Sequence, residues 1–184
     1  MKTQGNNTEA ADRFGGVAQE FCSAVESASK IDRTSLLTEV YRVLPRLINA
    51  AINLPSIEFP DENDATQEEE RAPFRPSARM TDDQWRQLYN LLQEKLGNWD
   101  VYWQVFNPTT DKEAVCGTLA DDFADIYRDL KEGLVLSHKR LARPEDVIWQ
   151  WRLLYYSHWG KHAIDALLTI HFRLQGVVDE PSVL

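Results

Sequence analysis

The stretch WQWRLLYYSHWGKHAIDALLTIHFRLQ, residues 149–175, decides the fold. Pro144 fits the first turn of a helix, and the chain then has no obvious break before Gly176, a natural C-terminal stop. A helix with apolar side chains around nearly its whole circumference belongs in the middle of a bundle. The sequence therefore predicts an all-α protein with a long central C-terminal helix. The apolar side chains of that helix are Trp149, Trp151, Leu154, Tyr155, Trp159, Ile164, Leu167, Leu168 and Phe172.

Three further helices are predicted upstream, because apolar residues recur there at the three-and-four spacing of one helical face. The first covers about residues 9–28, and the second follows Asp32, a suitable N-cap. The third begins at Thr81, which forms a capping box with Gln84, and continues to Gly97. Together with the helix below and the C-terminal helix, they predict a bundle of about five helices.

Between these helices lies an aromatic segment, residues 98–107, which is rich in β-branched and aromatic side chains. We expect it to be extended and to lie over the helices, because one short strand cannot form a sheet alone. A second capping box, Thr110 with Glu113, predicts the start of another helix. Cys116 would then lie in a helical apolar pattern.

The length of 184 residues is that of one ordinary domain, and we expect residues 1–184 to form a single helical domain. A proline-rich segment at about 55–80 contains the acidic run 61–70 and is predicted to be a disordered or mobile loop. Six of the 29 acidic residues lie in that run, so the other 23 face 20 basic residues. This near balance leaves no basic stripe for a phosphate backbone and argues against nucleic-acid binding.

The expected compartment is the cytoplasm. Residues 1–10 lack the apolar core of a signal peptide, and no stretch approaches the roughly 20 apolar residues of a membrane span. Cys22 and Cys116 lie in apolar patterns where a reduced thiol behaves as a small hydrophobic group. We therefore expect no membrane association and no disulfide.

A polar cluster interrupts the apolar C-terminal helix. His158, His162 and Asp165 project from one arc of roughly 60° when residues advance by 100°. Because an unpaired buried polar group costs on the order of 1–3 kcal/mol, something must face them. The preceding helix offers Asp122 and Asp125 at helical spacing.

This cluster has two interpretations. Two histidines and carboxylates on facing helices are a ligand set suited to Zn, Mn or Fe, so a divalent metal ion is the cofactor that the sequence admits, although it establishes none. Alternatively, the groups form a structural polar seam of hydrogen bonds and ion pairs, because buried polar groups are paired whether or not they do chemistry. The further residues of that seam would be Tyr127, Arg128, Asp129, Trp151 and Arg152.

Four segments in this order, RVLPRLINAAINLP, YWQVFNP, LADDFADIYRDLKEGL and WQWRLLYYSHWGKHAIDAL, resemble a family of uncharacterised bacterial all-helical proteins, a domain of unknown function. The resemblance covers about residues 14–174. It implies a bacterial, cytoplasmic, all-α protein and brings no activity, cofactor or catalytic residue with it.

The sequence has no Gly-rich phosphate loop, no GxSxG elbow and no CxxC pair, which sets those enzyme classes aside. The leading hypothesis is a non-catalytic helical protein that binds an unknown protein partner or a small-molecule ligand. The alternative is a metal-dependent enzyme, such as a hydrolase, that uses the cluster between the last two helices. The sequence does not indicate an oligomeric state.

Overall fold

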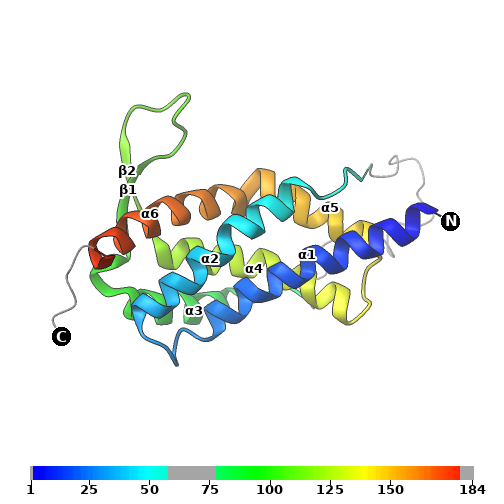
Figure 1. The fold of residues 1–184 in the computed structure, drawn as a ribbon, viewed down its shortest axis with the longest axis horizontal. Coiled ribbons are helices and arrows are strands. Elements are labelled where there is room, and N and C mark those ends of the chain that lie inside the picture. Colours follow the sequence, from blue (N-terminus) through cyan, green and yellow to red (C-terminus); the bar gives the residue numbers. More distant parts are fainter. Residues whose placement is uncertain (1, 58–77, 179–184) are drawn as a thin grey trace.

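The fold is a bundle of long helices with one β-hairpin standing away from it, as the computed structural model shows for residues 2–57 and 78–178 (Figure 1). The all-α class is confirmed. The elements in chain order are α1 (Lys2–Glu26), α2 (Arg33–Ile52), α3 (Asp82–Leu96), the short 3₁₀ helix η1 (Gly97–Trp99), β1 (Val101–Val105), β2 (Ala114–Thr118), α4 (Leu119–His138), α5 (Pro144–Leu154), the π-helical segment η2 (Tyr155–Trp159) and α6 (Gly160–Val178).

The predicted helix starts are confirmed where local chemistry sets them. Asp32 caps α2 by accepting a hydrogen bond from the backbone N–H of Ser35 at 3.0 Å. Both hydrogen bonds of the capping box between Thr81 and Gln84 are present at the start of α3. Pro144 begins α5, and α5, η2 and α6 follow one another without a connecting loop, which makes them the predicted long C-terminal helix.

The core lies where α1, α2, α4 and the α5–η2–α6 rod meet. Phe14 of α1 packs on Trp151 of α5, with ring centroids 4.7 Å apart, and both side chains are buried. Gly133 of α4 lets the Trp151 indole approach, because an added Cβ there would lie 2.1 Å from the indole nitrogen. Phe21 and Phe123 meet edge to face nearby.

One predicted helix start is wrong. The helix predicted to open at Thr110 begins instead at Leu119, where the Thr118 hydroxyl accepts from the backbone N–H of Asp121 at 3.3 Å. Residues 114–118 form strand β2, which pairs antiparallel with β1 and places Cys116 opposite Trp103. The physical reason is that pairing with β1 satisfies backbone groups that a helix would otherwise satisfy internally.

The aromatic segment is extended, as predicted, and its first residues contact the helices, because Arg173 of α6 donates to the carbonyl of Val101 and Tyr102 packs against the core. With β2 as its partner, β1 forms a hairpin that projects from the bundle beside α6 (Figure 1). Cys116 is accordingly exposed, whereas Cys22 is buried in the core, and both are free.

In its α6 part, the C-terminal helix is buried against the bundle on one side and exposed on the other. Ala163, Ala166 and Ile170 of α6 are buried, whereas Ile164, Leu168 and Phe172 are exposed. The prediction that this helix is buried all round is therefore wrong for α6. The exposed residues recur every four positions and form one apolar stripe on the outer face of the helix.

The predicted acidic loop falls mainly within residues 58–77, outside the part of the chain that the structure describes. The prediction of a single domain over residues 1–184 stays a prediction. Among the described residues, no helix is both long enough and apolar enough to cross a membrane.

Candidate functional site

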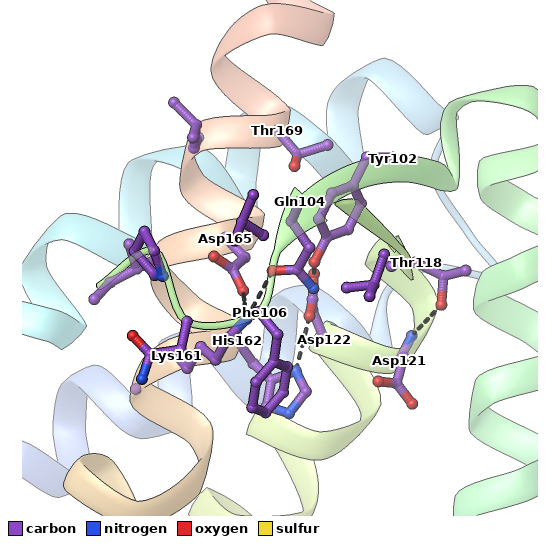
Figure 2. Close-up of a pocket in the computed structure, with 18 of the residues that line it drawn as sticks. Tyr102, Gln104, Phe106, Thr118, Asp121, Asp122, Lys161, His162, Asp165 and Thr169 are labelled. Atoms are coloured by element: carbon purple, nitrogen blue, oxygen red, sulfur yellow. Dashed lines mark hydrogen bonds and ion pairs between the residues drawn. The ribbon is translucent and has the colours of Figure 1, made fainter. Parts of the chain in front are cut away.

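A cleft of about 1150 Å³ lies between the hairpin and the η2–α6 part of the C-terminal rod (Figure 2). Polar side chains from four elements line it. They are Tyr102 and Gln104 of β1, Asp121 and Asp122 of α4, and His158, Lys161, His162 and Asp165 of η2 and α6. The predicted cluster therefore borders a cavity.

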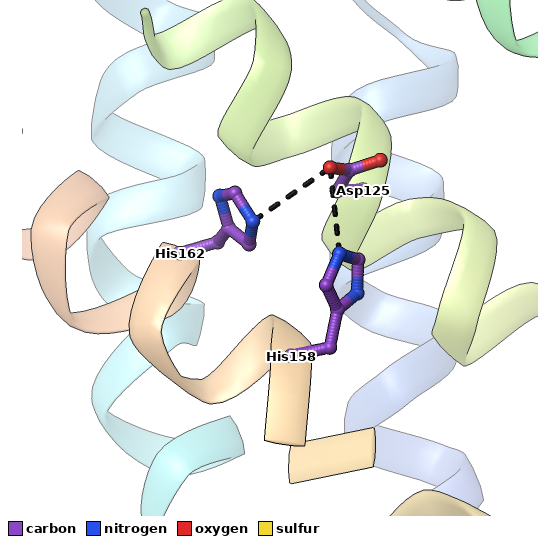
Figure 3. Close-up of side chains that lie close together, drawn as sticks. All are labelled: Asp125, His158 and His162. Atoms are coloured by element: carbon purple, nitrogen blue, oxygen red, sulfur yellow. Dashed lines mark ion pairs between the residues drawn. The ribbon is translucent and has the colours of Figure 1, made fainter. Parts of the chain in front are cut away.

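Both histidines, His158 and His162, face the carboxylate of Asp125 (Figure 3). The Nε2 atoms of His158 and His162 each lie 3.7 Å from Asp125 Oδ2. The two imidazole rings are 5.1 Å apart between centroids and inclined at 69°. Two histidines four residues apart on one helix thus converge on one carboxylate oxygen of the facing helix.

The other nitrogen of each histidine is held by a different aspartate. His162 Nδ1 lies 2.8 Å from Asp122 Oδ1, and His158 Nδ1 lies 2.6 Å from Asp129 Oδ2. An ionised carboxylate only accepts hydrogen bonds, so this network assigns a proton to each Nδ1. In the neutral imidazole, the lone pair is then on Nε2, the nitrogen that faces Asp125.

The remaining oxygen of Asp125 is occupied. Asp125 Oδ1 accepts from the indole N–H of Trp85 at 2.8 Å and pairs with Arg128 at 2.8 Å. Arg128 also lies 3.9 Å from Asp129 Oδ1. The guanidinium therefore contacts the outer oxygens of the two aspartates, and their inner oxygens face the imidazoles.

A π-helical segment carries His158. Residues 155–159 wind with one extra residue per turn, a feature that is frequent at functional sites. Gly160 permits it, because a Cβ at this position would lie 2.2 Å from the carbonyl oxygen of Tyr155. The local backbone that presents His158 thus depends on a residue without a side chain.

Tyr102 joins the hairpin to the cluster. Its hydroxyl donates to Asp122 Oδ2 at 2.8 Å (Figure 2). The ring lies over Gly117 on the paired strand, where an added Cβ would be 2.7 Å from it. Asp122 therefore has one oxygen on His162 and the other on Tyr102.

Burial sets the acid–base properties of this pair. Burial raises the pKa of Asp122 to about 6, although the hydrogen bonds from His162 and Tyr102 oppose the rise. Burial alone would lower the pKa of His162, but the hydrogen bond to Asp122 and the charges of Asp122, Asp125 and Asp121 raise it. Burial and the charge of Asp122 raise the pKa of Tyr102, which keeps its hydroxyl a donor.

The structure brings together most of the predicted ligands but not Asp165. Its carboxylate pairs with Lys161, four residues earlier on α6, and Lys161 also donates to Gln104 at 2.7 Å. Within the described residues, two groups of side chains have ligand atoms close enough for one ion. One is Asp125 with His158 and His162, and the other is Asp121 and Asp122 with His162.

Of the predicted seam, Arg128 and Asp129 belong to the cluster, and three residues have other contacts. Tyr127 donates to Glu26 at 2.8 Å, Trp151 donates to the carbonyl of Leu130 at 3.3 Å, and Arg152 donates to the carbonyl of Leu54 at 2.9 Å. The sequence interpretation missed Trp85, and it considered Tyr102 as a pocket-lining residue without linking it to the histidine–aspartate cluster. No signal in a single helical projection points to them, because they come from other elements.

The fold and the site define the class: an all-α protein with a His–Asp cluster on the floor of a cleft beside a hairpin. Residues 6–175 match the family model described as a domain of unknown function, DUF5063, and the chain belongs to that family. No curated protein matches it. Among solved structures it is similar to protein BF1032 from Bacteroides fragilis, with a TM-score of 0.68 and 22% identity over 93% of each chain, a likeness that shows the fold.

Proposed function

We propose that this protein binds a small amphipathic molecule in the cleft between the hairpin and α6, and that its role is binding rather than catalysis. The observation that carries the proposal is the cleft itself, which combines an exposed apolar wall with a polar floor. Ligand pockets are concave, largely apolar cavities with a few convergent polar groups. The volume of about 1150 Å³ suits a small molecule.

The apolar wall comes from both sides of the cleft. Ile164 and Leu168 of α6 line it on one side, and Phe106 and Val115 of the hairpin segment line it on the other. All four side chains are exposed. Covering them with the apolar part of a ligand would release about 25 cal/mol for each Å² removed from water.

The polar floor supplies directional contacts. The Lys161 ammonium lies between Gln104 and Asp165 and stands 4.8 Å over the Phe106 ring (Figure 2). Lys161 and Gln104 offer donors, and Asp165 offers acceptors, to a polar group that enters the cleft. A ligand with one polar end and one apolar end fits this arrangement.

The test uses Nile red, a neutral amphipathic dye whose fluorescence rises in apolar surroundings. Wild-type protein is expected to bind it saturably, with about one dye per chain. Ile164→Asp places a charge in the apolar wall and is expected to weaken binding tenfold or more. Ile52→Asp is the matched control, because Ile52 is 52% exposed and Ile164 is 53% exposed, and Ile52 lies outside the cleft lining.

The proposal fails if wild type shows no saturable binding, or if both variants lose binding equally. Circular dichroism on all three proteins separates a loss of binding from a loss of folding. Selective loss in Ile164→Asp supports the cleft as the binding site.

A metal-dependent hydrolase is the second candidate function. The observation that favours it is the convergence on Asp125 of imidazole nitrogens from two histidines that line the same cleft. Its test is metal-dependent hydrolysis of activated esters and phosphoesters, such as their p-nitrophenyl derivatives, which His162→Ala would abolish. Failure of both wild type and variant to hydrolyse these probes leaves binding as the proposed role.

We further propose that the protein acts in the bacterial cytoplasm. The sequence resemblance to bacterial helical proteins and the two free cysteines, Cys22 and Cys116, support this location. Fractionation of the native cells with an antibody against the chain tests it. Recovery in the membrane or secreted fraction would contradict it.

A further inference from the structure

Ligand atoms of Asp125, His158 and His162 all lie within 4.8 Å of one another, and the two histidines line the cleft. Both Nε2–Oδ2 separations, 3.7 Å, exceed the roughly 2.7–3.2 Å of a hydrogen bond. Ligand atoms about 2.0–2.1 Å from a tetrahedral ion lie roughly 3.3–3.4 Å from one another. The two Nε2–Oδ2 separations at Asp125 are therefore nearer to the separation of two ligand atoms around a metal ion than to the length of a hydrogen bond.

The hydrogen bonds around this trio orient it for an ion. A metal-ligating histidine normally donates its other ring N–H to a carboxylate or carbonyl, which fixes the ring and makes the ligating nitrogen more basic. Asp122 and Asp129 accept from the Nδ1 atoms of His162 and His158 in this way. A structural ion pair needs one carboxylate per imidazole, yet here each imidazole has one and faces a second.

Asp125 is held in the orientation that an ion needs. Trp85 and Arg128 both contact its Oδ1, so Oδ2 alone points between the imidazoles. The positive charge of Arg128 would oppose the binding of a cation between the imidazoles and Asp125. It lies on the outer side of Asp125, and the carboxylates of Asp122, Asp125 and Asp129 outnumber it.

The site has an entry path and an open side. The side chains of His158 and His162 are 35% and 22% exposed, and both line the cleft, whereas Asp125 is 11% exposed and is not among the lining residues. Three protein ligands with a fourth position open to a cavity are the arrangement of catalytic zinc sites.

We propose that His158 Nε2, His162 Nε2 and Asp125 Oδ2 bind one divalent transition-metal ion, of the zinc class, whose free coordination position opens into the cleft. Two imidazoles and one carboxylate suit Zn²⁺, Co²⁺ or Fe²⁺ better than Mg²⁺ or Ca²⁺, which prefer oxygen ligands throughout. This site does not depend on the amphipathic ligand proposed above. It supplies the ion that the metal-dependent hydrolase would require.

The experiment uses the full chain purified without an affinity tag, treated with EDTA and titrated with ZnCl₂ in a calorimeter. Wild type is expected to bind one Zn²⁺ per chain. Titration with CoCl₂ is expected to give the visible absorption bands of a four- or five-coordinate Co²⁺ ion. Ions scattered on surface carboxylates do not give these bands.

Three variants test the ligands one at a time. Asp125→Asn keeps an acceptor for Trp85 and Arg128 and removes the inner oxygen, so it preserves the local packing. His158→Ala and His162→Ala remove the imidazoles. Each variant is expected to weaken zinc binding at least about 100-fold and to abolish the cobalt bands. His171→Ala is the matched control, because His171 lies on the same rod outside the cleft and pairs with Tyr41.

Absence of zinc and cobalt binding by wild type overturns the proposal whatever the variants do. Unchanged zinc binding in all three variants also overturns it. Ile164→Asp separates the two sites, because it is expected to lose Nile red and keep Zn²⁺, whereas Asp125→Asn is expected to lose Zn²⁺ and keep Nile red.

Discussion

His162 is fixed by Asp122 on the side of its ring that faces away from Asp125: Nδ1 lies 2.8 Å from Asp122 Oδ1, and Nε2 lies 3.7 Å from Asp125 Oδ2. One aspartate orients the imidazole and another faces its free nitrogen. His158 repeats the relationship with Asp129 in the place of Asp122. A polar seam that served packing alone would be satisfied by the first contact of each pair.

We predict from this relationship that Asp129→Asn weakens zinc binding by about 10–100-fold without removing a ligand. An amide in place of the carboxylate no longer enforces a proton on His158 Nδ1 and leaves the imidazole less basic. Calorimetric titration of the EDTA-treated variant gives the change in Kd. The visible cobalt spectrum should persist, because the three ligand atoms remain.

Asp83→Asn is the control for this prediction, because Asp83 is an exposed aspartate paired with Arg86 on α3. It should bind zinc as wild type does. A Kd for Asp129→Asn equal to that of the control would mean that Asp129 has no influence on the ion.

Gly160→Ala should destabilise the protein by roughly 1–3 kcal/mol, the usual cost of forcing an atom into a filled space. Its Cβ would lie 2.2 Å from the Tyr155 carbonyl oxygen, so the π-helical segment must change its winding. His158 would then move with it, and zinc affinity should fall. Urea unfolding measures the first effect and calorimetry the second.

Gly16→Ala provides the matched control on α1, because a Cβ there meets no atom within 4 Å. In an open helical position this substitution should stabilise by about 0.5–1 kcal/mol. Equal free energies of unfolding for the two alanine variants would show that Gly160 is not needed for the backbone of η2.

The sequence predicted the fold where one residue and its near neighbours determine the outcome. The cap at Asp32, the capping box at Thr81 and the proline at residue 144 each act through backbone groups within one turn, and all three were predicted correctly. The four-residue spacing of His158 and His162 likewise placed both rings on one face.

The predictions from the sequence failed where the local structure depends on residues that are distant in the chain. Strand β2 exists because β1 pairs with it, and the propensity of residues 110–118 alone favoured a helix start. Trp85 reaches Asp125 from a third helix, a contact that no pattern along one helix predicts.

The two cysteines should differ sharply toward a thiol reagent. Burial raises the pKa of Cys22 to about 12, and its side chain is inaccessible, whereas Cys116 is exposed on β2. Because the thiolate is the reacting species, native protein at pH 8 should release one equivalent of chromophore from Ellman's reagent. A second equivalent should appear only in denaturant.

Cys116→Ser should abolish the native reaction, and Cys22→Ser should leave it intact. Rapid reaction of two thiols in the native protein would contradict the burial of Cys22.

The last prediction concerns acid stability and the contact of α1 with α4. Glu26 Oε1 accepts from Tyr127 at 2.8 Å and from Lys131 at 2.7 Å. Burial alone would raise the pKa of Glu26, but the hydrogen bonds from Lys131 and Tyr127 and the charge of Lys131 lower it.

A carboxyl whose pKa is lower in the folded state stabilises the fold fully above its unfolded pKa, roughly 4.3, and loses that contribution as the pH falls through the folded value. The coupling energy of Glu26→Gln with Lys131→Met, taken from urea unfolding, should thus be favourable at pH 7 and smaller at about pH 3. Glu26 and Lys131 are 45% and 32% exposed, so the coupling should stay below about 1 kcal/mol. A coupling energy that is the same at both pH values would mean that the ionised carboxylate contributes nothing to this contact.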